Sequence, residues 1–208
     1  MRVLIACEFS ATVRDAFRLL GHDAWSCDLL PCDRDPAWHI EGDVLSQLNE
    51  SWDLMIAHPP CTYLASSGLH WNKRRPERAA QTEEALRFVS ALAAAPISRI
   101  AVENPIECLS SRWRKPDQII HPHWFGDDAS KATCLWLKAL PPLEATLHVP
   151  PRLVDGRPRW ANQTDSGQNN LAPSADRWAL RSKTYQGIAD AMALQWGKLE
   201  SANQTRDV

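Results

Sequence analysis

Two short motifs contain residue types that could carry out covalent chemistry. Cys61 follows two prolines in the segment HPPC (58–61), and Glu103 opens the segment ENP (103–105). A cysteine thiolate can act as a nucleophile, and a carboxyl group with a raised pKa can hold a proton against charge that develops on a substrate. Either residue alone would also fit a structural role in a turn. Together they indicate a nucleophile and an acid that face the same reacting partner.

Polar residues also follow apolar runs nearer the start of the chain, namely Glu8, Ser10, Asp28 and Asp43. One carboxylate can accept hydrogen bonds from two ribose hydroxyls, and another can accept one from an adenine amino group. A single aspartate at the end of a strand more often forms a turn or caps a helix. Their recurrence at successive strand ends favours a site for a nucleoside.

The elements that must position these residues alternate between strands and helices. Apolar runs predict strands over 2–8, 23–30, 39–44, 52–59, 97–105 and 131–140. Helices are predicted over 10–22, 76–96 and 182–200. Ser10 or Thr12 should cap the first helix, and Gly21 should end it. The alternation is typical of an α/β fold with a doubly wound, mostly parallel sheet, in which the strand ends named above share one edge.

The composition of the chain changes along its length. Residues 1–140 are expected to form a catalytic and cofactor-binding domain, which the helix over 182–200 completes. Residues 141–181 are rich in Pro, Gly, Asn and Asp, which predicts a loop-rich insert that is longer than an ordinary connection. The polar residues 201–208 are expected to form a disordered tail.

The overall composition excludes several classes of protein. Hydrophobic residues make up 44% of the 208 residues, and the formal net charge is −2, which together exclude general disorder and a globally basic nucleic-acid coat. Without a recognisable signal peptide or membrane span, a soluble cytoplasmic protein is expected. The cysteines form no C-x-x-C pair and His121 and His123 have no further ligands nearby, so no metal site is expected. We expect a monomer, with a partner subunit as the alternative.

The motifs follow one another in the order found in the DNA cytosine-5 methyltransferases, and the chain resembles the short members of that family from phages and prophages. Residues 41–68 are similar to the acidic ribbon and the Pro-Cys motif of the family, and 99–105 to its Glu-Asn motif. Residues 130–140 are similar to its basic strand, and 184–193 to its closing helix. The chain lacks the family's glycines after Phe9–Ser10, has Lys131 and Thr133 in place of two arginines, and has a very short target-recognition region.

This resemblance implies a Rossmann-like methyltransferase fold and the transfer of a methyl group from S-adenosylmethionine to C5 of cytosine in DNA. Cys61 would add to C6 of the base as a thiolate of lowered pKa. Glu103, with a raised pKa, would stabilise charge at N3, and Lys131 would bind the base carbonyl or a phosphate. The residues implied to bind the cofactor are Phe9, Ser10, Asp28, Asp43, Val44 and Pro60.

Contacts with DNA are expected from two local basic clusters rather than from the whole surface. The segment 66–78 combines Trp71 with Lys73, Arg74 and Arg75, and a second cluster contains Arg112. Cationic side chains bind phosphates, and an aromatic ring can stack on a base that has left the duplex. Both clusters would also fit ordinary solvated surfaces.

Three other functions are compatible with the sequence. The chain could be a non-catalytic or partner-dependent DNA-binding relative, which the altered cofactor loop favours. It could be an amino-methyltransferase, although His58 lacks the amide or carboxylate that would hold an exocyclic amine. It could also methylate C5 in free nucleotides or single strands.

Overall fold

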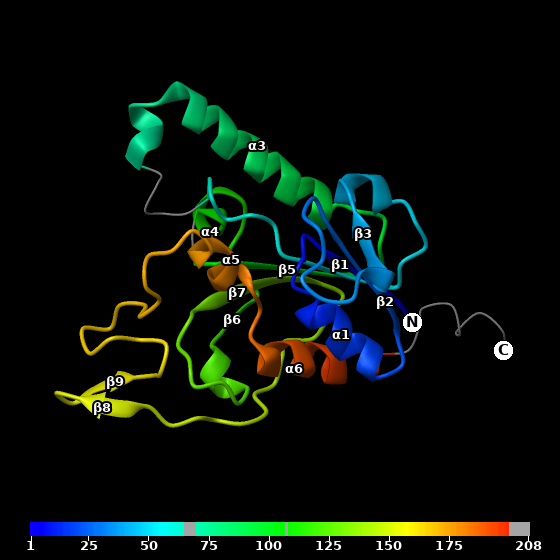
Figure 1. Ribbon diagram of the computed structural model, residues 1–208. Coiled ribbons are helices and arrows are strands. Elements are labelled where there is room, and N and C mark those ends of the chain that lie inside the picture. Colours follow the sequence, from blue (N-terminus) through cyan, green and yellow to red (C-terminus); the bar gives the residue numbers. More distant parts are fainter. Residues whose placement is uncertain (65–69, 107, 200–208) are drawn as a thin grey trace.

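A seven-stranded sheet runs through the computed structural model, which describes residues 1–64, 70–106 and 108–199 (Figure 1). Its strand order is β3-β2-β1-β4-β5-β7-β6. The strands are β1 (Arg2–Ala6), β2 (Asp23–Asp28), β3 (His39–Glu41), β4 (Leu54–Ala57), β5 (Arg99–Pro105), β6 (Gln118–Ile120) and β7 (Thr133–Lys138). The first five pair in parallel, and β7 is antiparallel to both β5 and β6. The predicted α/β class with a mostly parallel sheet is therefore confirmed.

The central strands are apolar on both faces because each face is covered. In β1, Val3 and Ile5 pack into one core cluster with residues of helices α1 (Thr12–Leu19) and α6 (Gln186–Trp196). Leu4 and Ala6 point to the other face, into a second cluster with residues of α3 (Pro76–Ala93). This alternation follows from the period of two along a strand. Figure 1 shows α1 and α6 on one side of the sheet and α3 on the other.

Two predicted elements near the end of the sheet are corrected by the structure. The strand predicted over 131–140 is the seventh, not the sixth, and it runs antiparallel. The sixth strand, β6, was not predicted because its three residues give too short a pattern. The direction of β7 could not be inferred either, since Thr133–Trp136 are all buried, as in a parallel strand.

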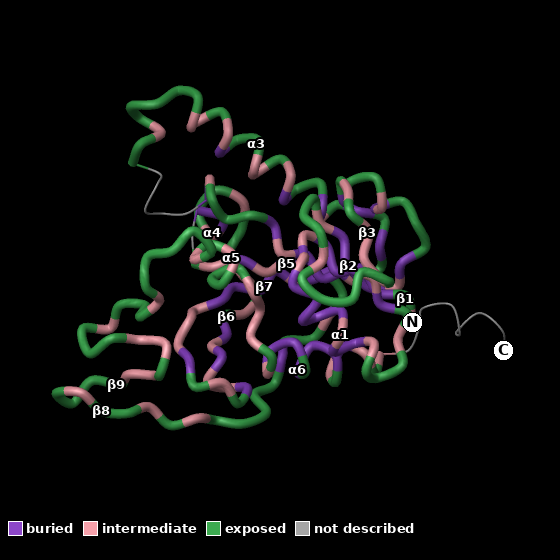
Figure 2. The backbone as a smooth tube through the Cα atoms, viewed as in Figure 1, coloured by how far each residue is buried: buried purple, intermediate pink, exposed green. Residues whose placement is uncertain are grey.

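The predicted loop-rich insert has more regular structure than its composition indicates. A hairpin is formed by β8 (Arg152–Val154) and β9 (Arg157–Arg159), and a short helix, α5, covers Arg177–Ser182. Asp155 and Gly156 connect the strands with φ angles of 50° and 73°, as an Asp-Gly turn allows. The helix predicted over 182–200 is therefore wrong at its start, because α6 begins only at Gln186. Figure 2 shows this hairpin as mainly exposed, in contrast to the buried sheet.

The remaining helical elements are short. They are α4 (Leu109–Arg112) and the 3-10 helices η1 (Pro36–Trp38), η2 (Val44–Gln47), η3 (His70–Lys73) and η4 (Pro122–Trp124). Gly21, with a φ of 83°, follows α1 as predicted. None of the helices in the described ranges is both long and apolar enough to cross a membrane. The tail expected to be disordered, 201–208, lies outside the described residues.

Candidate active site at the carboxyl edge of the sheet

Cys61 lies on an exposed loop directly after β4, which ends at Ala57. The loop is fixed to the neighbouring strand because the side-chain amide of Asn104 donates a hydrogen bond of 2.7 Å to the carbonyl oxygen of Pro59. Asn104 is only 1% exposed, so this bond is shielded from water. Beyond it, Pro60 and Cys61 are exposed. The sheet thus presents Cys61 to solvent at its carboxyl edge rather than burying it in a turn.

Glu103 lies beside this loop, at the carboxyl end of β5, and contacts a residue that sequence reasoning did not assign to the site. Its Oε2 is 3.1 Å from Nδ1 of His58, and the two side chains are 13% and 9% exposed. The pairing follows from the register of the sheet. Ala57 is opposite Val102 in the parallel pair β4–β5, which brings the next residues, His58 and Glu103, together. The repeated end-of-strand pattern could have indicated His58, since it also directly follows an apolar strand.

The electrostatics of Glu103 differ from the expectation of a raised pKa. Burial raises the pKa of this carboxyl group, but the hydrogen bond from His58 and the positive charges of Lys131 and His58 lower it. The net result is a pKa below the usual value, so that Glu103 is ionised at neutral pH in the free protein. The raised pKa was expected without the contact from His58, which lies 45 residues away in the chain.

Lys131 lies two residues before β7, the strand that pairs with β5. Its charge acts on Glu103, while its Nζ donates a hydrogen bond of 3.2 Å to the carbonyl oxygen of Arg181 at the end of α5. Lys131 therefore links the insert to the edge of the sheet. The role predicted for Lys131, to bind the base carbonyl or a phosphate, stays a prediction.

The loop after β1 is held by a carboxylate rather than by the predicted hydroxyl caps. Glu8 is 5% exposed, and its carboxylate accepts hydrogen bonds from the backbone N–H groups of Val13 (2.7 Å) and Arg14 (3.2 Å) at the start of α1. The hydroxyl of Ser10 donates to the same carboxylate over 3.3 Å. Neither predicted residue, Ser10 nor Thr12, is the N-cap. That position is Ala11, in the left-handed region with a φ of 58°. A carboxylate at a helix N-terminus is also favoured by the helix dipole.

Asp28, the last residue of β2, and Asp43, which follows β3, both form turns, and both also lie near the end of β1. Oδ1 of Asp28 accepts from the N–H of Leu30, and Oδ1 of Asp43 accepts from the N–H of Leu45 as the cap of η2. Burial, and then the negative charges of Asp28, Cys27 and Asp43, raise the pKa of the Cys7 thiol far above its usual value. The ends of β1, β2 and β3 therefore converge, as predicted. Asp43 lies beyond the strand predicted to contain it, since β3 ends at Glu41.

The other residues predicted to bind a cofactor lie around this convergence. The ring of Phe9 packs against Trp178 of α5, with 5.9 Å between ring centroids. Val44 is buried at the start of η2, and Pro60 is exposed beside Cys61. Phe9 thus brings a second part of the insert to the sheet edge, next to the contact made by Lys131.

The segment predicted to bind nucleic acid forms η3 and the start of α3, although residues 65–69 lie outside the described part. Trp71 is 39% exposed, and the guanidinium carbons of Arg74 and Arg75 lie 5.9 and 4.9 Å from the centroid of its ring. Lys73 is exposed at the end of η3. In Figure 1, η3 lies at the outer end of α3, away from the sheet. The segment therefore forms an exposed cluster of cations around one aromatic ring.

Arg112 is not part of that cluster. Its Nη2 forms an ion pair of 2.7 Å with Oε1 of Glu83 on α3, and both side chains are more than 40% exposed. Part of its charge is therefore already compensated within the protein.

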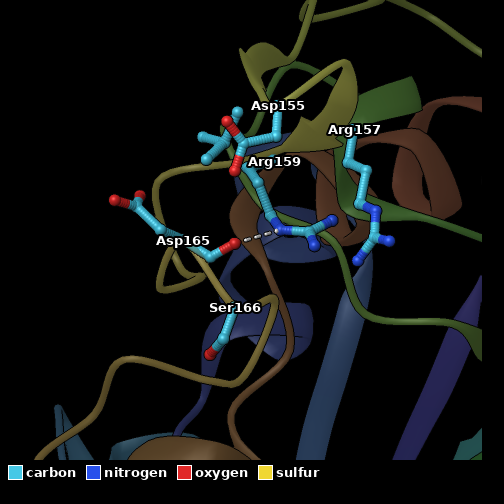
Figure 3. Close-up of a pocket in the computed structure, with 6 residues that line it drawn as sticks. Asp155, Arg157, Arg159, Asp165 and Ser166 are labelled. Carbon is cyan, nitrogen blue, oxygen red and sulfur yellow. Dashed lines mark hydrogen bonds between the residues drawn. The ribbon is translucent and has the colours of Figure 1, made fainter.

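Two hollows in the surface are lined by neither Cys61 nor Glu103. One of about 410 Å³ lies at the β8–β9 hairpin, lined by Val154, Asp155, Arg157, Arg159, Asp165 and Ser166 (Figure 3). Another, of about 310 Å³, lies against β5 and β7 beside Trp113. Both hollows lack the residues with predicted chemical roles, which converge instead at the carboxyl edge of the sheet. Among the described residues, no group of three or more His, Cys, Asp or Glu side chains could hold a metal ion.

In comparisons with known proteins, no family model and no curated protein match this chain.

Proposed function

We propose that the protein transfers a methyl group from S-adenosylmethionine to C5 of cytosine in DNA, with Cys61 as the nucleophile. One observation carries this proposal: an exposed cysteine and a mostly buried carboxyl group lie at the same edge of adjacent strands, and two side-chain hydrogen bonds join the loop after β4 to the end of β5. Addition of a thiolate to an aromatic ring needs such a pair, because charge develops on the ring as the bond to sulfur forms.

The residues near the end of β1 fit the proposed cofactor. The hydrogen bonds described for Asp28 and Asp43 engage Oδ1 of each, so that Oδ2 can accept hydrogen bonds from a ribose or an amino group. Burial raises the pKa of Asp28, which shows that this carboxylate lies in a partly desolvated place, where a hydrogen bond is stronger than in water. When bound there, S-adenosylmethionine would supply an electrophilic methyl group.

In the proposed reaction the chain's own residues activate the base. The Cys61 thiolate adds to C6, and the electron density displaced from the C5–C6 double bond makes C5 nucleophilic. Glu103 neutralises the charge that spreads to N3 once it carries a proton, because an ionised carboxylate would repel that charge. After C5 has gained the methyl group, a base removes the C5 proton and the thiolate leaves. Asn104 contributes by holding the Pro59 carbonyl, and with it the loop of Cys61.

DNA would be held mainly by the basic segment around η3. Lys73, Arg74 and Arg75 are exposed at the outer end of α3 and can bind phosphates. Trp71 offers a ring on which a base can stack. Since the insert is small, we expect a short or relaxed target sequence.

The proposal is tested by incubation of the protein with methyl-labelled S-adenosylmethionine and DNA, followed by mass spectrometry of the nucleosides. Labelled 5-methylcytosine is expected from the wild type and not from Cys61→Ser. Labelled N4-methylcytosine or N6-methyladenine would instead indicate an amino-methyltransferase. Calorimetry with the cofactor addresses the non-catalytic alternative, which predicts that S-adenosylmethionine does not bind.

A further inference from the structure

The ring of His58 is held on one side only. Its backbone N–H donates a hydrogen bond of 2.9 Å to the carbonyl oxygen of Ala6, which fixes the residue to β1. Its Nδ1 contacts Glu103 at 3.1 Å. The other ring nitrogen, Nε2, is buried and has no hydrogen-bond partner among the described residues.

A buried polar atom without a partner is costly, and in a native protein it calls for a specific reason, such as a catalytic role. The same edge holds a second such atom, Oδ1 of Asn104, in the side chain that braces the Cys61 loop. Both atoms belong to residues that contact the proposed machinery directly. Two of the unpartnered groups in the described part of the chain thus lie together at the edge where a substrate would bind.

The proposed reaction also needs a proton that Glu103 does not hold in the free protein. Its pKa is lowered, chiefly because the hydrogen bond from His58 and the charge of Lys131 outweigh the effect of burial. Lys131 is the other charged group that acts on this carboxylate, and its Nζ is bonded to the carbonyl oxygen of Arg181. Histidine is the side-chain type that exchanges protons near neutral pH.

We infer that His58 is a positioning residue for Glu103 and stores the proton that Glu103 delivers to the base. The inference rests on the function proposed above. The Nδ1 proton passes to the Glu103 carboxylate, so that imidazolium and carboxylate become imidazole and carboxylic acid. The acid then donates the proton to N3 as sulfur adds to C6, which leaves the ring neutral. When the thiolate departs, N3 returns the proton to Glu103 and Glu103 returns it to His58.

The first test measures the pair itself and requires no activity. In protein labelled with ¹³C at glutamate carboxyl groups, the resonance of Glu103 is assigned by its loss in Glu103→Gln and is followed through a pH titration. In His58→Ala, Glu103 should titrate at higher pH than in the wild type, because burial is then opposed by Lys131 alone. His148→Gln replaces an exposed histidine and should leave the titration unchanged. A Glu103 titration that is the same in the wild type and in His58→Ala would overturn the inference.

The second test measures the rate of covalent adduct formation with DNA that contains 5-fluorocytosine, as a function of pH. His58→Gln keeps a donor for Glu103 but cannot carry a proton. Its rate should fall by about tenfold or more, and the decline of the wild-type rate at high pH should disappear. If His58→Gln matches the wild type in both rate and pH profile, His58 only packs against Glu103 and the proton-storing role is rejected. If the wild type itself forms no adduct, the proposed function fails, and the proton-storing role fails with it.

Discussion

The side-chain hydrogen bonds at the Cys61 edge of the sheet span a far greater distance in sequence than those that the β8–β9 hairpin forms with the loop after it. Asn104 and Glu103 each reach across 45 residues, and their side chains are nearly buried. Arg152 of the hairpin pairs with Asp165, which lies only 13 residues away in the loop after β9, and the two side chains are 45% and 76% exposed. Chemistry needs groups fixed within fractions of an ångström, which buried long-range bonds provide. An exposed hairpin with local bonds can adapt to a partner, and this suits contact with a surface.

Loss of the proposed nucleophile should have the largest effect. Cys61→Ser should reduce the covalent adduct with 5-fluorocytosine DNA to background, because a hydroxyl is a far weaker nucleophile than a thiolate. The adduct is seen as a shifted band on a denaturing gel. Cys32→Ser, at a half-buried cysteine in the segment after β2, is the matched control and should keep the adduct. An adduct that survives in Cys61→Ser would remove the sheet edge from the chemistry.

DNA affinity should depend more on the basic segment at η3 than on the hairpin. Replacement of Lys73, Arg74 and Arg75 by Gln should weaken binding to all sequences about equally. It should also reduce the slope of log K against log salt by about 0.9 for each phosphate that the protein no longer neutralises. The matched triple variant in the hairpin, Arg152, Arg157 and Arg159 to Gln, should change the slope less. Fluorescence anisotropy at several salt concentrations measures both, and the reverse ranking would make the hairpin the main region that binds DNA.

The hydrogen bond from the side chain of Asn104 to the carbonyl oxygen of Pro59 should contribute strongly to stability. Asn104→Ala removes the hydrogen bond to Pro59 and leaves its carbonyl oxygen without that donor, so the free energy of unfolding should fall by about 1–3 kcal/mol. Urea denaturation measures this change. Asn49→Ala, at an exposed position, should stay within about 0.5 kcal/mol of the wild type. Equal effects of the two substitutions would show that the Asn104–Pro59 hydrogen bond does not stabilise this edge of the sheet.

The lowered pKa of Glu103 should make part of the stability dependent on acid. A carboxyl group with a folded-state pKa below the unfolded value stabilises the fold above the unfolded pKa, about 4.3 for Glu. This contribution is lost as the pH falls from that value through the folded-state pKa. In urea denaturation at a series of pH values, Glu103→Gln should therefore lose less stability than the wild type on acidification. Parallel curves for the two proteins would contradict the lowered pKa.

The smallest effect is expected in the hairpin. Arg152→Ala removes an exposed ion pair with Asp165, and such pairs contribute about 0.2–1 kcal/mol. Urea denaturation should show a loss in this range, and 1 M salt should reduce it further by screening. A loss as large as that of Asn104→Ala would mean that the hairpin is as firmly built as the sheet edge.

Local sequence patterns were sufficient to predict the parallel part of the sheet and the end of the first helix. Apolar runs with alternating faces located five parallel strands, and Gly21 was recognised as the residue that follows α1. The same reasoning placed Cys61 after one strand and Glu103 at the end of the next, which are the neighbours β4 and β5. The Asp155–Gly156 turn also carried a local signal for a hairpin, which the polar composition of the insert obscured.

Only the tertiary structure decided which side chains meet. The contact between His58 and Glu103 depends on the register between β4 and β5, and the capping of α1 by Glu8 depends on the left-handed backbone at Ala11. The antiparallel direction of β7, which brings Lys131 toward Glu103, is likewise a property of the assembled sheet. Burial and opposite charge shift a carboxyl pKa in opposite directions. The sequence therefore determined that an acid stands at the end of β5, whereas its charge state was decided by neighbours that folding brings from far along the chain.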